Sequence, residues 1–198
     1  MPAATFSSRN RVSACYFGEG ATAEGAFHES MNMAELWQLP VLFCCENNRY
    51  AMGTAIDREL SQVDLIAKAE AYRVPAASAD GMDVLASHAA MQRAVEHIRT
   101  TGGPFFLEFR TYRFRPHSMF DPELYRDKAE VAEWRDEHDP IRMFTDRCLA
   151  ANLLSAEDVA AIEAAAAAEV ADAVAYAEAG TLESVETLTH NVMTPVTS

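Results

Sequence analysis

Short apolar runs alternate with segments of helical periodicity along this chain, and that alternation limits the folds it can adopt. The run VSACYF over 12–17 stops at Gly18, and the run VLFCCE over 41–46 stops at a pair of asparagines. Between the two runs, apolar residues recur at helical spacing until Pro40, which marks the end of a helix. A strand, a helix and a second strand in this order indicate a parallel βαβ unit whose strands are buried on both faces.

The same alternation continues further along the chain. We expect, in order, a helix over 64–72, a weaker strand over 74–79, a helix from Val84 that is closed by Gly102, and a strand over 105–112. Residues 160–179 are so rich in alanine that propensity alone predicts a helix. We therefore predict the α/β class: a parallel sheet with helices on both faces, a helical C-terminal part, and a ligand site at the carboxyl ends of the strands.

The length of the chain favours one domain with at most a small appendage, since about 150 residues per domain is the norm. We divide its 198 residues into an N-terminal extension over 1–11, one domain over 12–180 and a C-terminal tail over 181–198.

The charge balance argues against two classes of partner. Sixteen Lys and Arg against 30 Asp and Glu give a formal net charge of −14. Nucleic acids and anionic membranes are bound by clustered basic residues, and no basic stripe offsets the negative charge here. The N-terminus lacks the pattern of a cleaved signal, and no apolar run is long enough to cross a bilayer. We expect a cytoplasmic protein with no nucleic-acid or membrane partner.

Polar residues follow the first two predicted strands at the point where each one ends. Glu19 lies in Gly18-Glu19-Gly20 after the first strand, and Asn48 follows the second. Neighbouring parallel strands bring such loops to one edge, where a carboxylate and an amide oxygen are ligands suited to Mg²⁺. The helix that we expect from near Thr22 directs its free N–H groups to the same place, and helix N-termini attract phosphate. Each piece alone is a common turn or loop, but together they predict a magnesium diphosphate site.

The residues from Gly18 to Asn48 resemble the thiamine diphosphate motif, which opens on Gly-Asp-Gly and closes on Asn-Asn. The surrounding stretch FGEGATAEGAFHESMNMAELWQLPVLFCCENNRYAMGT and the block TYRFRPHSMFDPELYR over 111–126 are similar to the alpha subunit of the thiamine-dependent 2-oxoacid dehydrogenases. That family includes the pyruvate, branched-chain 2-oxoacid and acetoin enzymes. The resemblance implies the family's thiamine diphosphate-binding fold, with an N-terminal truncation relative to it.

The resemblance also implies how the cofactor would be held. Glu19 would take the place of the aspartate that binds Mg²⁺, Asn48 would supply its side-chain oxygen, and Tyr50 its main-chain carbonyl. Gly20 and Ala21 would approach the diphosphate. Because Glu is one methylene longer than Asp and Mg²⁺ tolerates little distortion of its octahedron, we expect a metal position that is shifted or weaker.

A second set of residues is implied in the loop over 111–126. Arg113 and His117 match the catalytic residues that reach the diphosphate and the reacting intermediate, and His117 could donate a proton. Ser118 stands where eukaryotic relatives are inactivated by phosphorylation. Three further residues match family loop residues that order the entrance of the active site and contact the lipoyl-bearing partner. These are Asp121, Tyr125 and Arg126. Without the resemblance, His117 is an ordinary loop histidine and these residues form a surface turn.

By this resemblance the chain is part of an oxidoreductase that decarboxylates a 2-oxoacid and passes the acyl group to a lipoyl acyltransferase component. A beta subunit would supply the glutamate that activates the cofactor, so we expect the chain alone to be inactive. Family alpha subunits have a much longer segment before the glycine motif, which implies a separately encoded N-terminal half. The alternatives are a truncated reading frame, or a non-catalytic interaction subunit or decayed fragment. Pyruvate, branched-chain 2-oxoacids and acetoin all remain possible substrates.

Overall fold

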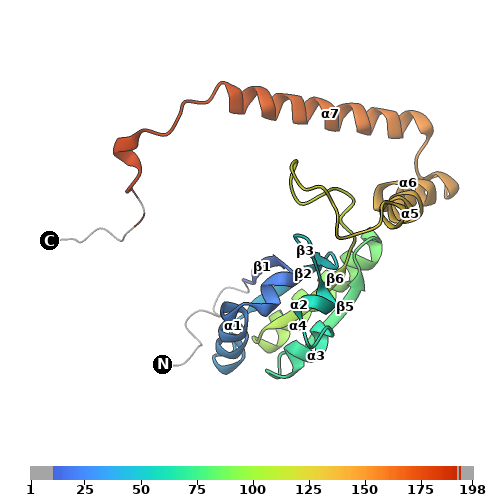
Figure 1. The fold of residues 1–198 in the computed structure, drawn as a ribbon. Coiled ribbons are helices and arrows are strands. Elements are labelled where there is room, and N and C mark those ends of the chain that lie inside the picture. The colour runs from blue at the N-terminus through green and yellow to red at the C-terminus, as the bar shows by residue number, and fades with distance from the viewer. Residues whose placement is uncertain (1–10, 191, 193–198) are drawn as a thin grey trace. The chain divides into compact units, whose positions relative to one another are not determined.

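The computed structural model describes residues 11–190 and residue 192. Its N-terminal part contains a four-stranded parallel sheet (Figure 1). The strands lie in the order β1-β2-β6-β5, and every neighbouring pair is parallel. Their bounds are Ser13–Gly18 for β1, Val41–Asn47 for β2, Ala76–Asp80 for β5 and Phe105–Arg110 for β6. The four strands predicted from the apolar runs are therefore all present. The prediction that both strands of the first βαβ unit are buried was wrong for β1, which is largely exposed because it lies at the edge of the sheet.

Helices cover both faces of this sheet, because alternate residues of its central strands point to opposite sides. Phe43 of β2 packs in a cluster with helices α1 (Gly25–Leu36) and α3 (Leu65–Glu70). Leu42, the preceding residue, packs in a second cluster with helix α4 (Val84–Thr101). The predicted α/β class is confirmed.

Local signals set the bounds of helix α4. The Asp83 side chain accepts hydrogen bonds from the N–H groups of Leu85 and Ala86, which caps the helix at its start. Gly102 has a φ of 81°, a left-handed conformation that glycine adopts without strain, and it ends the helix as predicted.

The register of β1 and β2 places their carboxyl ends side by side, with Gly18 opposite Glu46. The turn η2 (Glu19–Ala23) follows β1 directly, and Asn48 follows β2. The prediction that these two loops meet at one edge of the sheet is confirmed.

Two local expectations were wrong. The first helix begins at Gly25 rather than near Thr22, because residues Glu19–Ala23 form a tighter 3₁₀ turn. The second expectation, that the polar stretch over 46–54 is a loop, was wrong because this stretch begins in β2 and continues into a short antiparallel hairpin, β3 (Tyr50–Ala51) and β4 (Thr54–Ala55). Helix α2 (Ile56–Glu59) follows the hairpin.

The C-terminal part is helical, as predicted. It contains α5 (Lys128–His138), α6 (Pro140–Ala150), α7 (Ala156–Glu178) and the 3₁₀ turn η3 (Val185–Thr187). Helix α7 buries none of its residues, and its start is closed by a reciprocal capping box between Ser155 and Asp158. No helix of the described residues is long and apolar enough to span a membrane.

The chain divides into two compact units, Met1–Asp146 and Arg147–Ser198. The predicted boundary between a domain and a tail at 180/181 stays a prediction. The extension over 1–11 lies outside the described residues, apart from Arg11.

Candidate functional site

A cavity of about 500 Å³ opens at the carboxyl ends of β1 and β2, and we call it the edge cavity. It is lined by most of the residues singled out from the sequence, which come from the turn after β1, the segment after β2 and the loop over 111–126. Those seven residues are Glu19, Gly20, Ala21, Asn48, Tyr50, Arg113 and His117.

Glu19 is the most deeply buried acid of the edge cavity, with only 2% of its surface exposed. Its Oε2 atom accepts a hydrogen bond of 3.0 Å from the main-chain N–H of Asn48. Its Oε1 atom is buried and has no hydrogen-bond partner among the described residues. Burial raises the pKa of the Glu19 carboxyl, and the hydrogen bond from Asn48 and the charge of Arg113 offset this only in part. An unpaired buried carboxylate oxygen is costly, and a cation would satisfy it.

Two residues that the sequence analysis did not identify stabilise the turn that carries Glu19 by hydrogen bonds to its carbonyl groups. Thr22 is fully buried, and its hydroxyl donates a 2.7 Å hydrogen bond to the carbonyl of Glu19. Lys68 of α3 donates through Nζ to the carbonyl of Thr22, also at 2.7 Å. Nothing in the sequence signals this contact, because Lys68 lies on a separate helix.

Both polar atoms of the Asn48 side-chain amide form hydrogen bonds. Its Nδ2 donates to the carbonyl of Glu46 at 3.2 Å, and its Oδ1 accepts from the Thr111 hydroxyl at 3.1 Å. Tyr50 lies in β3, and its phenol donates to the carboxylate of Glu130 at 3.3 Å. The phenol of Tyr50 is therefore bonded to Glu130, and the predicted metal ligand of this residue is its main-chain carbonyl.

Gly20 in the turn after β1 and Ala51 in the segment after β2 lie close together. A Cβ atom at Gly20 would lie 2.6 Å from the Cβ of Ala51, a distance that real structures do not show. The bare backbone at Gly20 therefore allows the loops to approach each other, and it also lets a ligand come close to main-chain N–H groups.

Arg113 reaches from the loop over 111–126 to the hairpin that follows β2. Its Nη2 donates to the carbonyl of Met52 at 2.7 Å and to the hydroxyl of Tyr125 at 3.3 Å. Its Nη1 lies 3.3 Å from Nδ1 of His117. Since a guanidinium can only donate, Nδ1 accepts, and the neutral imidazole then carries its proton on Nε2.

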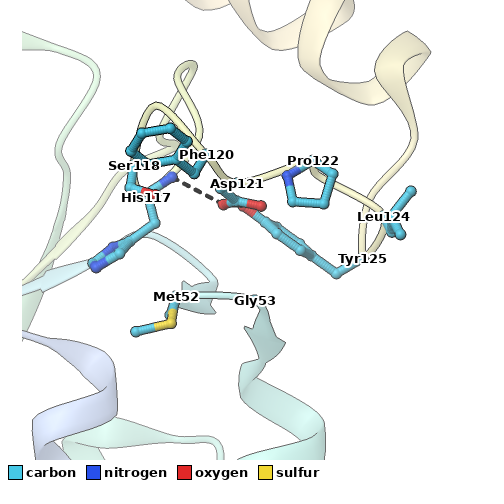
Figure 2. A pocket seen from close by; sticks show the side chains of 9 residues that line it. All are labelled: Met52, Gly53, His117, Ser118, Phe120, Asp121, Pro122, Leu124 and Tyr125. Carbon is cyan, nitrogen blue, oxygen red and sulfur yellow. Dashed lines mark hydrogen bonds between the residues drawn. The ribbon is translucent and has the colours of Figure 1, made fainter.

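A second hollow, the loop cavity, has a volume of about 510 Å³ and is lined by the nine residues labelled in Figure 2. At its centre, Asp121 accepts hydrogen bonds from the N–H groups of Glu123 and His117, and from the hydroxyl of Tyr125 at 2.8 Å. These hydrogen bonds lower the pKa of the Asp121 carboxyl, and the bond from the Glu123 N–H has the largest effect. Met52 and His117 line both cavities.

Arg126 and Ser118 differ sharply in exposure. The Arg126 side chain is only 1% exposed, pairs with Glu123, and donates to the main-chain carbonyls of Arg113 and Phe114. It therefore holds the loop from inside, and its guanidinium does not face solvent. Ser118 is exposed at the rim of the loop cavity.

The donor set of the edge cavity suits a cation that is shared with a ligand. The described residues contain no group of three or more His, Cys, Asp or Glu that could hold a metal ion alone. Mg²⁺ is commonly bound by one or two carboxylates and completes its shell with water and phosphate oxygens. Glu19, the amide of Asn48 and an anionic ligand could meet that requirement together.

Comparison with known proteins identifies the family of the chain. The sequence pattern of the family described as "Dehydrogenase E1 component" matches residues 2–186. The chain is 43% identical over 173 residues to the pyruvate dehydrogenase E1 component subunit alpha of Rhizobium meliloti, which covers 87% of this chain and 50% of the relative. It is 40% identical over 181 residues to the subunit of the same name from Zymomonas mobilis, covering 91% and 51%.

The somatic mitochondrial form of the same subunit from Homo sapiens is 36% identical over 191 residues, which covers 96% of this chain and 48% of the relative. The chain thus spans about half the length of the curated relatives it matches. The resemblance seen in the segments Gly18–Asn48 and 111–126 is therefore confirmed. The chain belongs to the dehydrogenase E1 component family and is similar to its alpha subunits.

Proposed function

We propose that this chain is part of the E1 alpha subunit of a 2-oxoacid dehydrogenase, and that its edge cavity holds Mg²⁺ and the diphosphate of thiamine diphosphate. The observation that carries the proposal is the Oε1 atom of Glu19, which is buried without a partner beside Asn48. Because relatives are named as pyruvate dehydrogenase subunits, pyruvate is the first substrate to test. A cytoplasmic location is part of the proposal.

The residues of the edge cavity fit the cofactor in two respects. Glu19, the amide oxygen of Asn48 and the carbonyl of Tyr50 would supply oxygen ligands for Mg²⁺, and Gly20 and Ala21 line the same cavity, where their backbone would approach the diphosphate. When bound, thiamine diphosphate supplies the carbanion stabilisation that lets a 2-oxoacid lose carbon dioxide.

The charge of the edge cavity supports a requirement for a divalent cation. Four carboxylates line it, those of Glu19, Glu24, Glu46 and Glu59, and the cationic residue among the lining groups is Arg113. A diphosphate entering alone would meet net negative charge, so binding should require the divalent cation.

Arg113 and His117 line the same cavity from the loop over 111–126. Arg113 directs its guanidinium into the space between Met52 and His117, where it can face an anionic group. With Nδ1 of His117 accepting from Arg113, the Nε2–H of His117 is free to donate to the reacting group. In this proposal, His117 then holds the proton that is moved during acyl transfer to a lipoyl carrier.

The proposed partners are a beta subunit, a lipoyl acyltransferase component and the remainder of an alpha subunit, whether that remainder lies on the same polypeptide or on another. Strand β1 is an edge strand, and Tyr16 within it is 59% exposed. An open strand edge readily pairs with another strand. We propose that the remainder of the alpha subunit covers β1.

The test is reconstitution of the chain with the remainder of an alpha subunit and a beta subunit. We expect pyruvate-dependent dye reduction that requires both thiamine diphosphate and Mg²⁺. Asn48→Ala should weaken Mg²⁺-dependent cofactor binding, measured by calorimetry, while Glu70→Gln on the exposed side of α3 should leave it unchanged. An assembled complex that reduces no dye with any 2-oxoacid, and in which Asn48→Ala binds the cofactor normally, would support a non-catalytic interaction subunit instead.

A further inference from the structure

A third cavity, of about 470 Å³, lies at the carboxyl ends of β5 and β6, and we call it the tryptophan cavity. It shares no lining residue with the edge cavity or the loop cavity. The residues that matter for its chemistry are Arg49, Ser78, Arg110, Trp134, His138 and Met143. Crevices at the carboxyl ends of parallel strands are the places where α/β proteins bind ligands.

Cationic groups gather in the tryptophan cavity although the chain as a whole carries a net charge of −14. Arg110 uses its Nε to pair with Glu108 at 3.2 Å, which leaves its terminal amino groups directed to solvent on a side chain that is 65% exposed. The central guanidinium carbon of Arg49 lies 4.5 Å from the centroid of the Trp134 ring, a cation–π contact that keeps the positive charge beside the cavity. The lining carboxylate is Asp80, whose Oδ1 already accepts from the Met82 N–H.

Aromatic packing makes one wall of this cavity rigid. Trp134 is stacked on Tyr112, with ring centroids 5.1 Å apart and planes 5° apart, and His138 lies 4.7 Å from it. The sulfur-containing side chains of Met82 and Met143 add an apolar surface to the lining. Two guanidinium groups beside an apolar wall, in a space larger than an inorganic anion needs, suit an organic anion.

We propose that the tryptophan cavity is a second ligand site, which binds a small organic oxyanion through Arg49 and Arg110. The head of the ligand is a phosphate or a carboxylate, since both match the planar donor geometry of arginine. The body of the ligand lies against Trp134 and Met143. This proposal does not depend on the cofactor assignment of the edge cavity.

The experiment follows Trp134 directly. The sequence has two tryptophans, so Trp37→Phe leaves Trp134 as the single fluorescent indole in the full chain. We titrate this variant with phenyl phosphate, benzoate and inorganic phosphate, each against sodium chloride at equal ionic strength. We expect a saturable change in emission with phenyl phosphate or benzoate, because an anion at Arg49 would shift the guanidinium that lies on the indole. The tighter binder of the two organic anions identifies the head group.

Matched variants locate the binding. In the Trp37→Phe background, Arg110→Gln should weaken the organic anion about tenfold or more, as expected for loss of a charge-assisted pair, whereas Arg93→Gln on the exposed side of α4 should not. Ser78→Asp places a carboxylate in the cavity and should weaken binding as Arg110→Gln does. Because it keeps the ion pair between Arg110 and Glu108, it tests the site even if Arg110→Gln unfolds the chain.

Three outcomes would overturn the proposal. The first is an emission change that sodium chloride reproduces. The second is equal binding by the Arg93→Gln and Ser78→Asp variants. The third is inorganic phosphate binding as tightly as phenyl phosphate and benzoate, because then the apolar wall contributes nothing.

Discussion

The edge cavity and the loop over 113–126 both carry residues of the candidate site, but they are built by different means. At the edge cavity, Glu19 and Asn48 are placed by two parallel strands in register, and the turn at Glu19 is supported by buried Thr22 and Lys68. The loop has no regular secondary structure of its own. It is held by hydrogen bonds that the Asp121 carboxylate accepts and that the Arg126 guanidinium donates. A change in a strand therefore disturbs the sheet, while a change in those side chains should release the loop alone.

The exposed tips of the two regions differ as well. Met119, Phe120 and Leu124 of the loop are 93%, 90% and 89% exposed, whereas Glu19 and Thr22 at the edge are 2% and 0% exposed. Large apolar side chains that stand in solvent are typical of surfaces that are covered by a partner or a ligand. The turn at Glu19 is thus tightly packed, whereas the tip of the loop leaves large apolar side chains exposed.

Arg126→Met gives the strongest test of this division. It removes a buried guanidinium that pairs with Glu123 and binds two carbonyls, and breaking a buried pair costs about 3 kcal/mol. We expect hydrogen exchange over 113–126 to become much faster, with α4 and β6 unchanged. Lys128→Met, an exposed neighbour, is the control. Equal loss of protection in the sheet would mean that the loop and the sheet open as one unit.

Glu19→Gln should act on binding and leave the loop intact. The amide keeps the size of the side chain but removes the negative charge that faces the cation, and removing even the partners of metal ligands costs 10–100-fold in affinity. We expect Mg²⁺ affinity of the assembled complex, measured by calorimetry in the presence of cofactor, to fall by about 100-fold or more. An affinity within a few-fold of the parent would remove Glu19 from the metal site.

The same carboxyl predicts how stability depends on pH. Burial raises the pKa of Glu19 in the folded chain above its unfolded value, so the folded state binds a proton more readily. The stabilisation is present at pH below the unfolded pKa and is lost as the pH rises through the folded pKa. In chelator, we expect the parent to lose stability over that window relative to Glu19→Gln, and added Mg²⁺ to reduce the loss. Parallel pH profiles of urea midpoints for the two proteins would contradict this account.

The sequence was most informative where backbone periodicity alone decides the geometry. Alternating apolar runs were enough to predict the four parallel strands, and strand order then brought Glu19 within 3.0 Å of Asn48 although other elements separate them. The start of α1 at Gly25 was missed because a 3₁₀ turn and the start of an α-helix have the same local signals.

Contacts between distant side chains could not be predicted from the sequence. Lys68 supports the turn at Thr22 from another helix, and Arg126 is buried although arginine is almost always exposed. The hairpin after β2 depends on Arg49 and Met52 in left-handed conformations, with φ of 68° and 56°, which residues of this type rarely adopt. The roles assigned to individual site residues stay predictions.

Tyr125→Phe should give the smallest effect and the most local one. The substitution removes the hydroxyl that donates to Asp121 at 2.8 Å and accepts from Arg113, but it keeps the ring that packs on Gly53. Asp121 retains the N–H groups of Glu123 and His117, so the loop should stay closed and its opening should become only about threefold more frequent, as for one modest hydrogen bond.

The pKa of Asp121 should rise towards its usual value, because one of the bonds that lower it is gone. Hydrogen exchange over 113–126 and an NMR titration of Asp121 measure the two effects separately. If Tyr125→Phe released the loop as fully as Arg126→Met, the hydroxyl rather than the buried guanidinium would be what keeps the loop closed.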